Sequence, residues 1–259
     1  MEDVYLSGNF NAEGEREPWL RSELIAPWWE IVLVLMVMLG PFAYSSTHFA
    51  LKTNSPDFIS KMLTDRGFLI LIAKEGGLLA FFFFYLRRRN WNSSDFKIGM
   101  DWKGTLQAPL LLLTAGFANI FTALTLHVGI AWLAPHPDGL LAALMANSTH
   151  IPRHSIEIAW GLIIVGSIVN AYLEELVFMG YAFNQFAAKR GPLFALFSMV
   201  FLRMLLHTYK GPIDMLGIGA FSFVYGLAYQ YLGRLWPLIL AHACMDILAF
   251  SVLKLIFGR

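Results

Sequence analysis

The sequence predicts an all-α fold, a polytopic transmembrane helical bundle of seven to eight spans. Of the 259 residues, 57% are hydrophobic and only 14% are charged, whereas a soluble domain carries about 25% charged residues. Several apolar runs reach the ~20 residues that a helix needs to cross ~30 Å of hydrocarbon. No segment shows the alternation of apolar and polar residues that is typical of a half-buried strand.

Seven apolar runs are the predicted spans in chain order. The first is opened by Pro27 and a pair of tryptophans at interface depth, and the second is closed by three arginines. The runs cover about 27–48, 67–86, 107–133, 156–187, 191–209, 213–232 and 235–256. An eighth span results if the long third or fourth run is broken. Residues 138–147 are expected to form an interfacial helix too short to span.

The short loops predict one integrated bundle with a tail in front of it. Residues 1–25 are interpreted as a solvent-exposed tail that lies at the interface through Trp19 and Leu20, since they lack the basic and apolar regions of a signal peptide. Residues 26–155 form N-terminal transmembrane helices and residues 156–259 the C-terminal core helices.

Charge and cysteine content exclude several classes of protein. A net charge of +1 gives no reason to expect a nucleic-acid partner. The single cysteine, Cys244, excludes an intrachain disulfide and thiolate metal sites. The basic loop from Arg87 to Lys103 favours a cytoplasmic position for that loop, and hence a cytoplasmic N-terminus.

Ionisable residues within the predicted spans are the candidate functional residues. The stretch NAYLEELVFMGYAF, residues 170–183, holds two adjacent glutamates, and one charged side chain at the bilayer centre costs roughly 2.5–3.5 kcal/mol on insertion scales. The ionisable side chains in the spans are Lys74, Glu75, Glu174, Glu175, Arg203, His207, His242 and Asp246. Lys74 and Glu75 form either a buried charge pair that fixes helix packing or a support for an active site.

Five of these side chains can converge in one polar pocket. Two carboxylates lie on the fourth run and one histidine on the fifth, while His242 and Asp246 lie one turn apart on one face of the seventh. A carboxylate beside a histidine in a partly desolvated pocket is typical of a general base that activates water.

At these residues the sequence resembles the CAAX-protease and bacteriocin-processing (CPBP, or Abi) family of intramembrane proteases. EELVFMGY resembles the family's first motif, RMLLH its second, and the run WPLILAHACMD its last. The resemblance covers about residues 156–256. It implies a CPBP-like catalytic core, a bacterial inner-membrane location and a membrane-associated peptide substrate with a hydrophobic or lipidated segment.

The resemblance also implies residue roles and a mechanism without a metal cofactor. Glu174 matches the glutamate that activates water together with a histidine, here His207. Glu175 matches the second glutamate, which supports the site. His242 and Asp246 match the pair that stabilises the oxyanion.

Two positions depart from the family pattern. The motif arginine is replaced by Met179, and the motif phenylalanine by Arg203. Either the cation has moved from one helix to the other, to support Glu175, or Arg203 extends to the membrane interface and the site is degenerate.

Three alternatives to a metal-free protease stay open at this point. Glu174, His207 and His242 could hold zinc, with Asp246 as an outer partner, although no HExxH motif is present. A catalytically degenerate pseudoprotease could act in bacteriocin self-immunity or in membrane-protein regulation. A transporter is disfavoured because the polar residues lie in the C-terminal half without an inverted repeat.

Overall fold

The computed structural model describes residues 20–51, 63–96, 98–133 and 157–257, and the described chain is a helical membrane bundle, as predicted. The only bridge between extended residues that the described ranges contain joins Thr64 to Glu157. The α-helices are α1 (Trp28–Leu51), α3 (Asp65–Arg88), α4 (Trp102–Leu133), α6 (Trp160–Glu175), α7 (Asn184–Arg190), α8 (Pro192–Leu206), α9 (Pro212–Leu232) and α10 (Trp236–Phe257). The predicted interfacial helix at 138–147 lies outside the described residues.

The described residues contain six helices that are long and apolar enough to span a membrane, so the predicted count of seven to eight is slightly too high. The difference is the run at 191–209. It forms α8, which has only 15 residues and is therefore about 22 Å long at 1.5 Å per residue. That length falls short of the ~30 Å hydrocarbon core.

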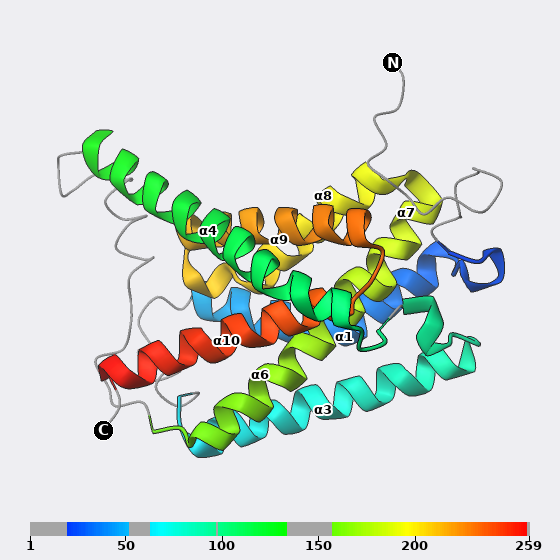
Figure 1. Cartoon of the computed structure of the whole chain (residues 1–259), viewed down its shortest axis with the longest axis horizontal. Helices are drawn as coiled ribbons and strands as arrows, with labels where there is room; N and C mark the ends of the chain where they lie inside the picture. Colours follow the sequence, from blue (N-terminus) through cyan, green and yellow to red (C-terminus); the bar gives the residue numbers. More distant parts are fainter. Residues whose placement is uncertain (1–19, 52–62, 97, 134–156, 258–259) are drawn as a thin grey trace.

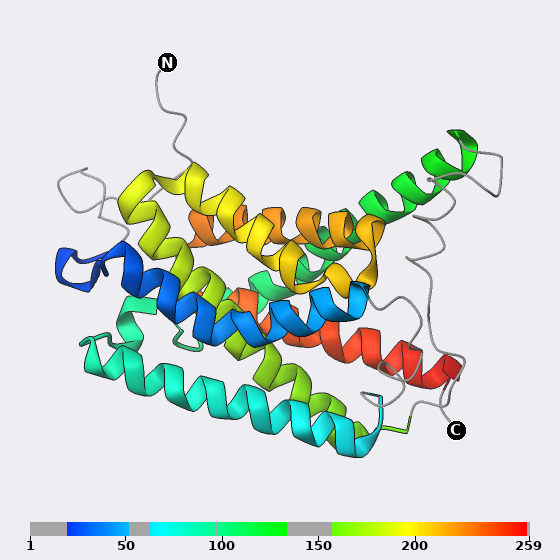
Figure 2. The same ribbon diagram turned by 180° about the vertical axis from the view of Figure 1, so that it is seen from behind.

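One long helical segment crosses the bundle diagonally (Figure 1). It consists of α6, the segment η3 (Leu176–Phe183) and α7, and it counts as a single candidate span. α3 and α10 pack against α6, α4 packs against α9 and α10, and α1 packs against α8. The view from behind shows α1 lying across the face opposite α4 (Figure 2). The N-terminal helices therefore enclose the helices of the C-terminal core.

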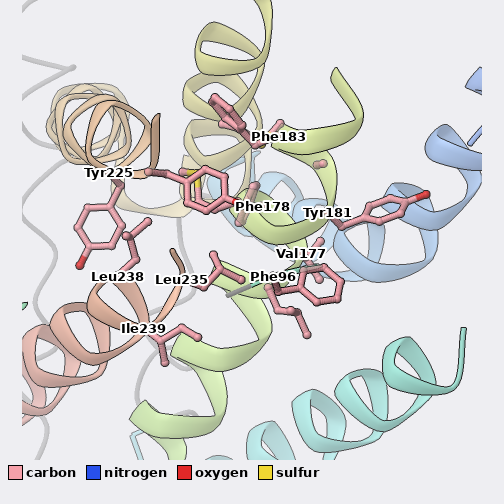
Figure 3. Close-up of a cluster of buried hydrophobic side chains, with 14 of the residues drawn as sticks. Phe96, Val177, Phe178, Tyr181, Phe183, Tyr225, Leu235, Leu238 and Ile239 are labelled. Carbon is pink, nitrogen blue, oxygen red and sulfur yellow. The ribbon is translucent and has the colours of Figure 1, made fainter. Parts of the chain in front are cut away.

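The centre of this crossing segment is π-helical rather than α-helical. All eight residues of η3 are buried. Side chains from this segment, α9, α10 and Phe96 gather around it in one apolar cluster (Figure 3). π-Helical turns are rare and frequently lie at functional sites, and this one begins directly after Glu174 and Glu175. No feature of the sequence predicted this π-helical turn.

The prediction of a solvent-exposed tail is wrong for its last residues. Leu20 and Leu24 are buried in the main hydrophobic cluster. The buried Gln185 of α7 accepts a hydrogen bond from the Ala26 amide at 2.9 Å and donates one to the Leu24 carbonyl at 2.8 Å. These bonds satisfy backbone groups that would otherwise be buried without partners. Trp19 lies outside the described residues.

Candidate active site

Glu175 lies at the centre of the candidate site. Its Oε1 accepts hydrogen bonds from Arg203 Nη2 at 2.7 Å and from His242 Nδ1 at 2.7 Å. The side chain is completely buried. Three helices, α6, α8 and α10, are thus joined by one carboxylate oxygen. Charge-assisted bonds of this length are among the stronger ones in proteins.

Arg203 is buried and does not extend to the membrane interface. It is 1% exposed, and its guanidinium carbon lies 4.7 Å from the Phe178 ring centre and 5.4 Å from that of Phe221. The cation that the family pattern places at position 179 comes here from α8, while Met179 lies buried in η3. The alternative in which Arg203 snorkels is therefore wrong.

The Glu174 carboxylate has fewer bonding partners than the carboxylate of Glu175. Its side chain is 16% exposed, and its nearest charged partner is Arg203 Nε, 3.7 Å from Oε2. That separation exceeds a hydrogen bond, and no side chain or backbone group of the described residues hydrogen-bonds to the Glu174 carboxylate. Its oxygens are therefore free to hold a water molecule beside a buried cation.

His207 lies just after the end of α8, where the backbone leaves the helical conformation. Its Nδ1 lies 2.9 Å from the Arg203 carbonyl oxygen. A carbonyl can only accept, so Nδ1 carries the hydrogen and Nε2 of the neutral ring is left as an acceptor. His207 is close enough to Arg203 and His242 to interact electrostatically with both. A direct contact with Glu174 is not among the interactions of the described side chains.

His242 and Asp246 lie on one face of α10, as their spacing predicts. His242 Nε2 lies 3.6 Å from Asp246 Oδ2, which is longer than a hydrogen bond. Asp246 Oδ2 instead accepts a hydrogen bond from Asn170 Nδ2 at 2.8 Å. Asn170 was not predicted, although it lies one turn before Glu174 and thus on the same face of α6.

The interpretation of Lys74 and Glu75 as a buried charge pair is wrong. Lys74 is exposed and Glu75 is buried. Successive residues point about 100° apart around a helix of 3.6 residues per turn, and in α3 this turns Glu75 toward the bundle and Lys74 away from it. The carboxylate of Glu75 interacts electrostatically with Glu174, Asp246 and His242.

The candidate residues do not fit a metal ion in their present arrangement. Among the described residues, no three His, Cys, Asp or Glu side chains are grouped closely enough to hold one metal. The set Glu174, His207 and His242 therefore does not form a zinc site here. His242 also points its Nδ1 at Glu175 rather than toward a shared centre.

Comparison with known proteins confirms the resemblance. Residues 156–248 match the model of the family described as type II CAAX prenyl endopeptidase Rce1-like. No curated protein and no solved structure matches the chain. The matched segment begins before α6 and ends in α10, so it contains both glutamates, Arg203, His207, His242 and Asp246. The chain is thus an integral, multi-pass membrane protein whose C-terminal core is similar to the Rce1-like endopeptidases of the CAAX-protease family.

Proposed function

We propose that the protein is an intramembrane endopeptidase in which Glu174 activates a water molecule for attack on a peptide bond. The observation that carries the proposal is the difference between two adjacent carboxylates. Glu175 Oε1 is bound by Arg203 and His242 at 2.7 Å each, whereas the Glu174 carboxylate accepts no hydrogen bond from the described residues. One glutamate holds the helices together, and the other is free to act as a general base.

The first step is proton transfer from water to Glu174 as the water oxygen bonds to the peptide carbonyl carbon. Negative charge then develops on the carbonyl oxygen. His242 donates a hydrogen bond to this oxyanion from Nε2, because Nδ1 is already engaged by Glu175. Asp246, held by Asn170, lies 3.6 Å from Nε2 and favours the doubly protonated ring.

The second step returns the proton to the leaving amine as the carbon–nitrogen bond breaks. Glu174 supplies the proton directly or through His207, whose Nε2 is available as an acceptor because Nδ1 faces the Arg203 carbonyl. The hydrolysis balances without a metal or a redox cofactor, because water supplies the hydroxyl group of the new carboxyl end and the proton of the leaving amine.

The substrate class follows from where the site lies. Its side chains come from helices of a membrane bundle, and only small fractions of Glu174 and Asp246, 16% and 20%, are exposed. A peptide with a hydrophobic or lipidated segment, such as a lipidated tail or a leader peptide, can enter the membrane and reach a site that lies among its spanning helices. The name of the matched family makes a prenylated peptide the first to be tried.

The test compares membranes from cells that carry the wild-type protein with those that carry Glu174→Ala. We expect precursor peptides to accumulate in the variant, and the purified wild-type protein in liposomes to cleave them. Glu23→Ala is the control, because Glu23 is an exposed glutamate with a side chain 63% exposed. Identical peptide sets in all three membranes would contradict the proposal and favour a pseudoprotease. Loss of cleavage on chelation, with bound zinc in the purified protein, would favour the zinc mechanism.

A further inference from the structure

Helices α3 and α6 begin at the same end of the bundle and run in the same direction. Just before α3, Thr64 pairs in parallel with Glu157, and the Asp65 amide donates to the Glu157 carbonyl at 3.0 Å. The Asp65 carboxylate in turn accepts from the Ala159 amide at 2.6 Å. The two helices then pack against each other, and Figure 1 shows α6 leaving this shared end at an angle to α3. Residues at similar distances from the shared start therefore lie near each other where the two helices are in contact.

Two contacts between α3 and the crossing segment bracket the level of Glu75. On one side, Phe68 packs onto Gly166 so closely that an added Cβ would lie 2.6 Å from Phe68 Cε1. On the other side, the rings of Phe82 and Tyr181 meet edge to face at 5.6 Å. Glu75 lies seven residues after Phe68, and Glu174 lies eight residues after Gly166. At a rise of about 1.5 Å per residue in α3 and α6, the two residues lie within one residue's rise of the same depth.

Glu75 is enclosed but not paired. It is 3% exposed, and its Oε2 has no hydrogen-bond partner within the described part of the chain. The charged groups that interact electrostatically with it are Glu174, Asp246 and His242. The site cation Arg203 is bound to Glu175 instead. A buried carboxylate without a bound cation is costly, and the neutral acid is the form that avoids this cost.

A neutral carboxyl group can donate a hydrogen bond, which an ionised one cannot. Glu174 has free acceptor oxygens at nearly the same depth. The match to the Rce1-like family starts at residue 156 and so does not include α3. Nothing in the comparison therefore assigns a role to Glu75.

We propose that Glu75 is a positioning residue of the candidate active site: its carboxyl group carries a proton and donates a hydrogen bond to Glu174 through one water molecule. The bond holds the Glu174 carboxylate in the orientation in which its other oxygen accepts a proton from the attacking water. The consequence for catalysis rests on the proposed function, whereas the hydrogen bond itself does not.

The first test measures the bond without any substrate. Infrared difference spectra of the full-length protein in liposomes are compared for wild type, Glu75→Gln and Glu174→Gln. We expect a carbonyl stretch of a protonated carboxyl group that disappears in Glu75→Gln and shifts in frequency in Glu174→Gln, because the latter changes the acceptor. Lys74→Gln, on the exposed side of the same turn, should leave the band unchanged.

Two outcomes of the spectra overturn the proposal. A spectrum in which Glu75→Gln removes no band shows that Glu75 is ionised. A band that Glu174→Gln does not shift shows that the two side chains do not interact. Both results are obtained whether or not the protein cleaves peptides, so failure of this inference is distinguishable from failure of the proposed function.

The second test asks whether Glu75 acts in catalysis or only in packing. Glu75→Leu removes the donor but fills the space, so kcat should fall about tenfold with KM unchanged, the scale typical of losing an outer partner of a reacting group. Glu75→Gln should lose less, because its amide still donates. Thermal stability of Glu75→Leu should be equal to or higher than that of wild type, because an apolar side chain avoids desolvation. If Glu75 acts only in packing, Glu75→Leu leaves kcat unchanged, and this result would overturn the positioning role.

Discussion

Two spans of this protein have the same mean hydropathy and opposite surroundings. In the most apolar window of Trp102–Ile130, 11% of the residues are buried in the bundle, whereas in that of Trp160–Arg190 the share is 56%. The first lies at the surface of the bundle and the second crosses its centre. Hydropathy therefore identifies both as membrane segments but does not reveal which one can carry charge.

The difference in burial explains where the polar side chains are. α4 presents a stripe of exposed apolar side chains, among them Leu110, Phe117 and Leu124. The crossing segment instead holds polar groups whose partners come from other helices. Glu175 is bound by Arg203 and His242, and Asn184 by the Tyr229 hydroxyl. A charge is tolerated within the membrane where neighbouring helices supply its partner.

The largest difference between the two spans should be in catalysis. Glu174→Gln on the crossing segment, or His207→Ala beside it, is expected to lower the rate of peptide cleavage by ~10²–10⁴-fold, as loss of a general base does. The thermal unfolding midpoint should change little. Thr114→Ala on exposed α4 is the control and should keep full activity. Cleavage within a few-fold of wild type in either site variant would rule out the assigned roles.

The next largest effect should be on stability. Arg203→Met leaves Glu175 with one partner fewer in a completely buried position, and loss of one member of a buried ion pair costs ~3–5 kcal/mol. Unfolding by denaturant in detergent micelles measures the loss. Arg88→Met, at an exposed position on α3, should be close to silent.

A double variant sharpens the same point. Met179→Arg together with Arg203→Phe restores the family pattern and returns the cation from the segment that carries Glu175. We expect it to recover much of the stability that Arg203→Met loses, because Met179 is buried in η3, one turn after Glu175. An equally unstable double variant would show that only α8 can supply this charge.

Substitution of a glycine packed against α4 and of a glycine within α4 should change stability in opposite directions. Gly217 of α9 lies against α4, where an added Cβ would meet Asn119 Oδ1 at 2.5 Å and its backbone oxygen at 3.0 Å. Gly217→Ala should therefore cost ~1–3 kcal/mol of stability, as overpacking does. Gly116 of α4 has nothing within 4 Å of an added Cβ, so Gly116→Ala should stabilise by roughly 0.5–1 kcal/mol. Equal effects in unfolding measurements would contradict the packing between α4 and α9.

The smallest effect should be at the exposed start of α4. The Asp101 carboxylate accepts a hydrogen bond from the Gly104 amide at 2.7 Å and forms an ion pair with Arg234 at 2.8 Å. The hydrogen bond from Gly104 and the charge of the Arg234 guanidinium lower the pKa of Asp101. A lowered pKa means stabilisation that is present above the ordinary value of 3.8 and is lost as pH falls below it. The small difference in unfolding midpoint between wild type and Asp101→Asn should therefore shrink from pH 7 to pH 3. A constant difference would contradict this.

The positions of the helices could be predicted because they depend on local properties. Predicted runs at 67–86, 213–232 and 235–256 became Asp65–Arg88, Pro212–Leu232 and Trp236–Phe257. Length, hydropathy and flanking residues determine such ends, since the thickness of the hydrocarbon core sets the length of a span. The run at 191–209 was apolar but too short as a helix, which composition alone did not reveal.

The motifs in the sequence also identified which residues to consider, but only the tertiary structure decided how they pair. Sequence left Arg203 with two possible surroundings, and packing among Phe178, Phe221 and Glu175 selected one. Asn170 was missed because it belongs to no recognised motif, and for Glu75 the sequence left a charge pair and a support for the active site as alternatives. Their importance depends on neighbours far away in the chain.

By itself, therefore, the sequence determined a helical membrane bundle, the approximate ends of its spans and the resemblance of about residues 156–256 to a protease family, of which residues 156–248 match the family model. These properties follow from apolar length and from the order of a few side chains along one chain. Only the tertiary structure decided that Glu75 faces inward while Lys74 faces outward, that η3 is π-helical, and that Glu175 rather than Glu174 receives the cation. The physical reason is that burial and electrostatic pairing are properties of several helices at once, and no single stretch of sequence contains them.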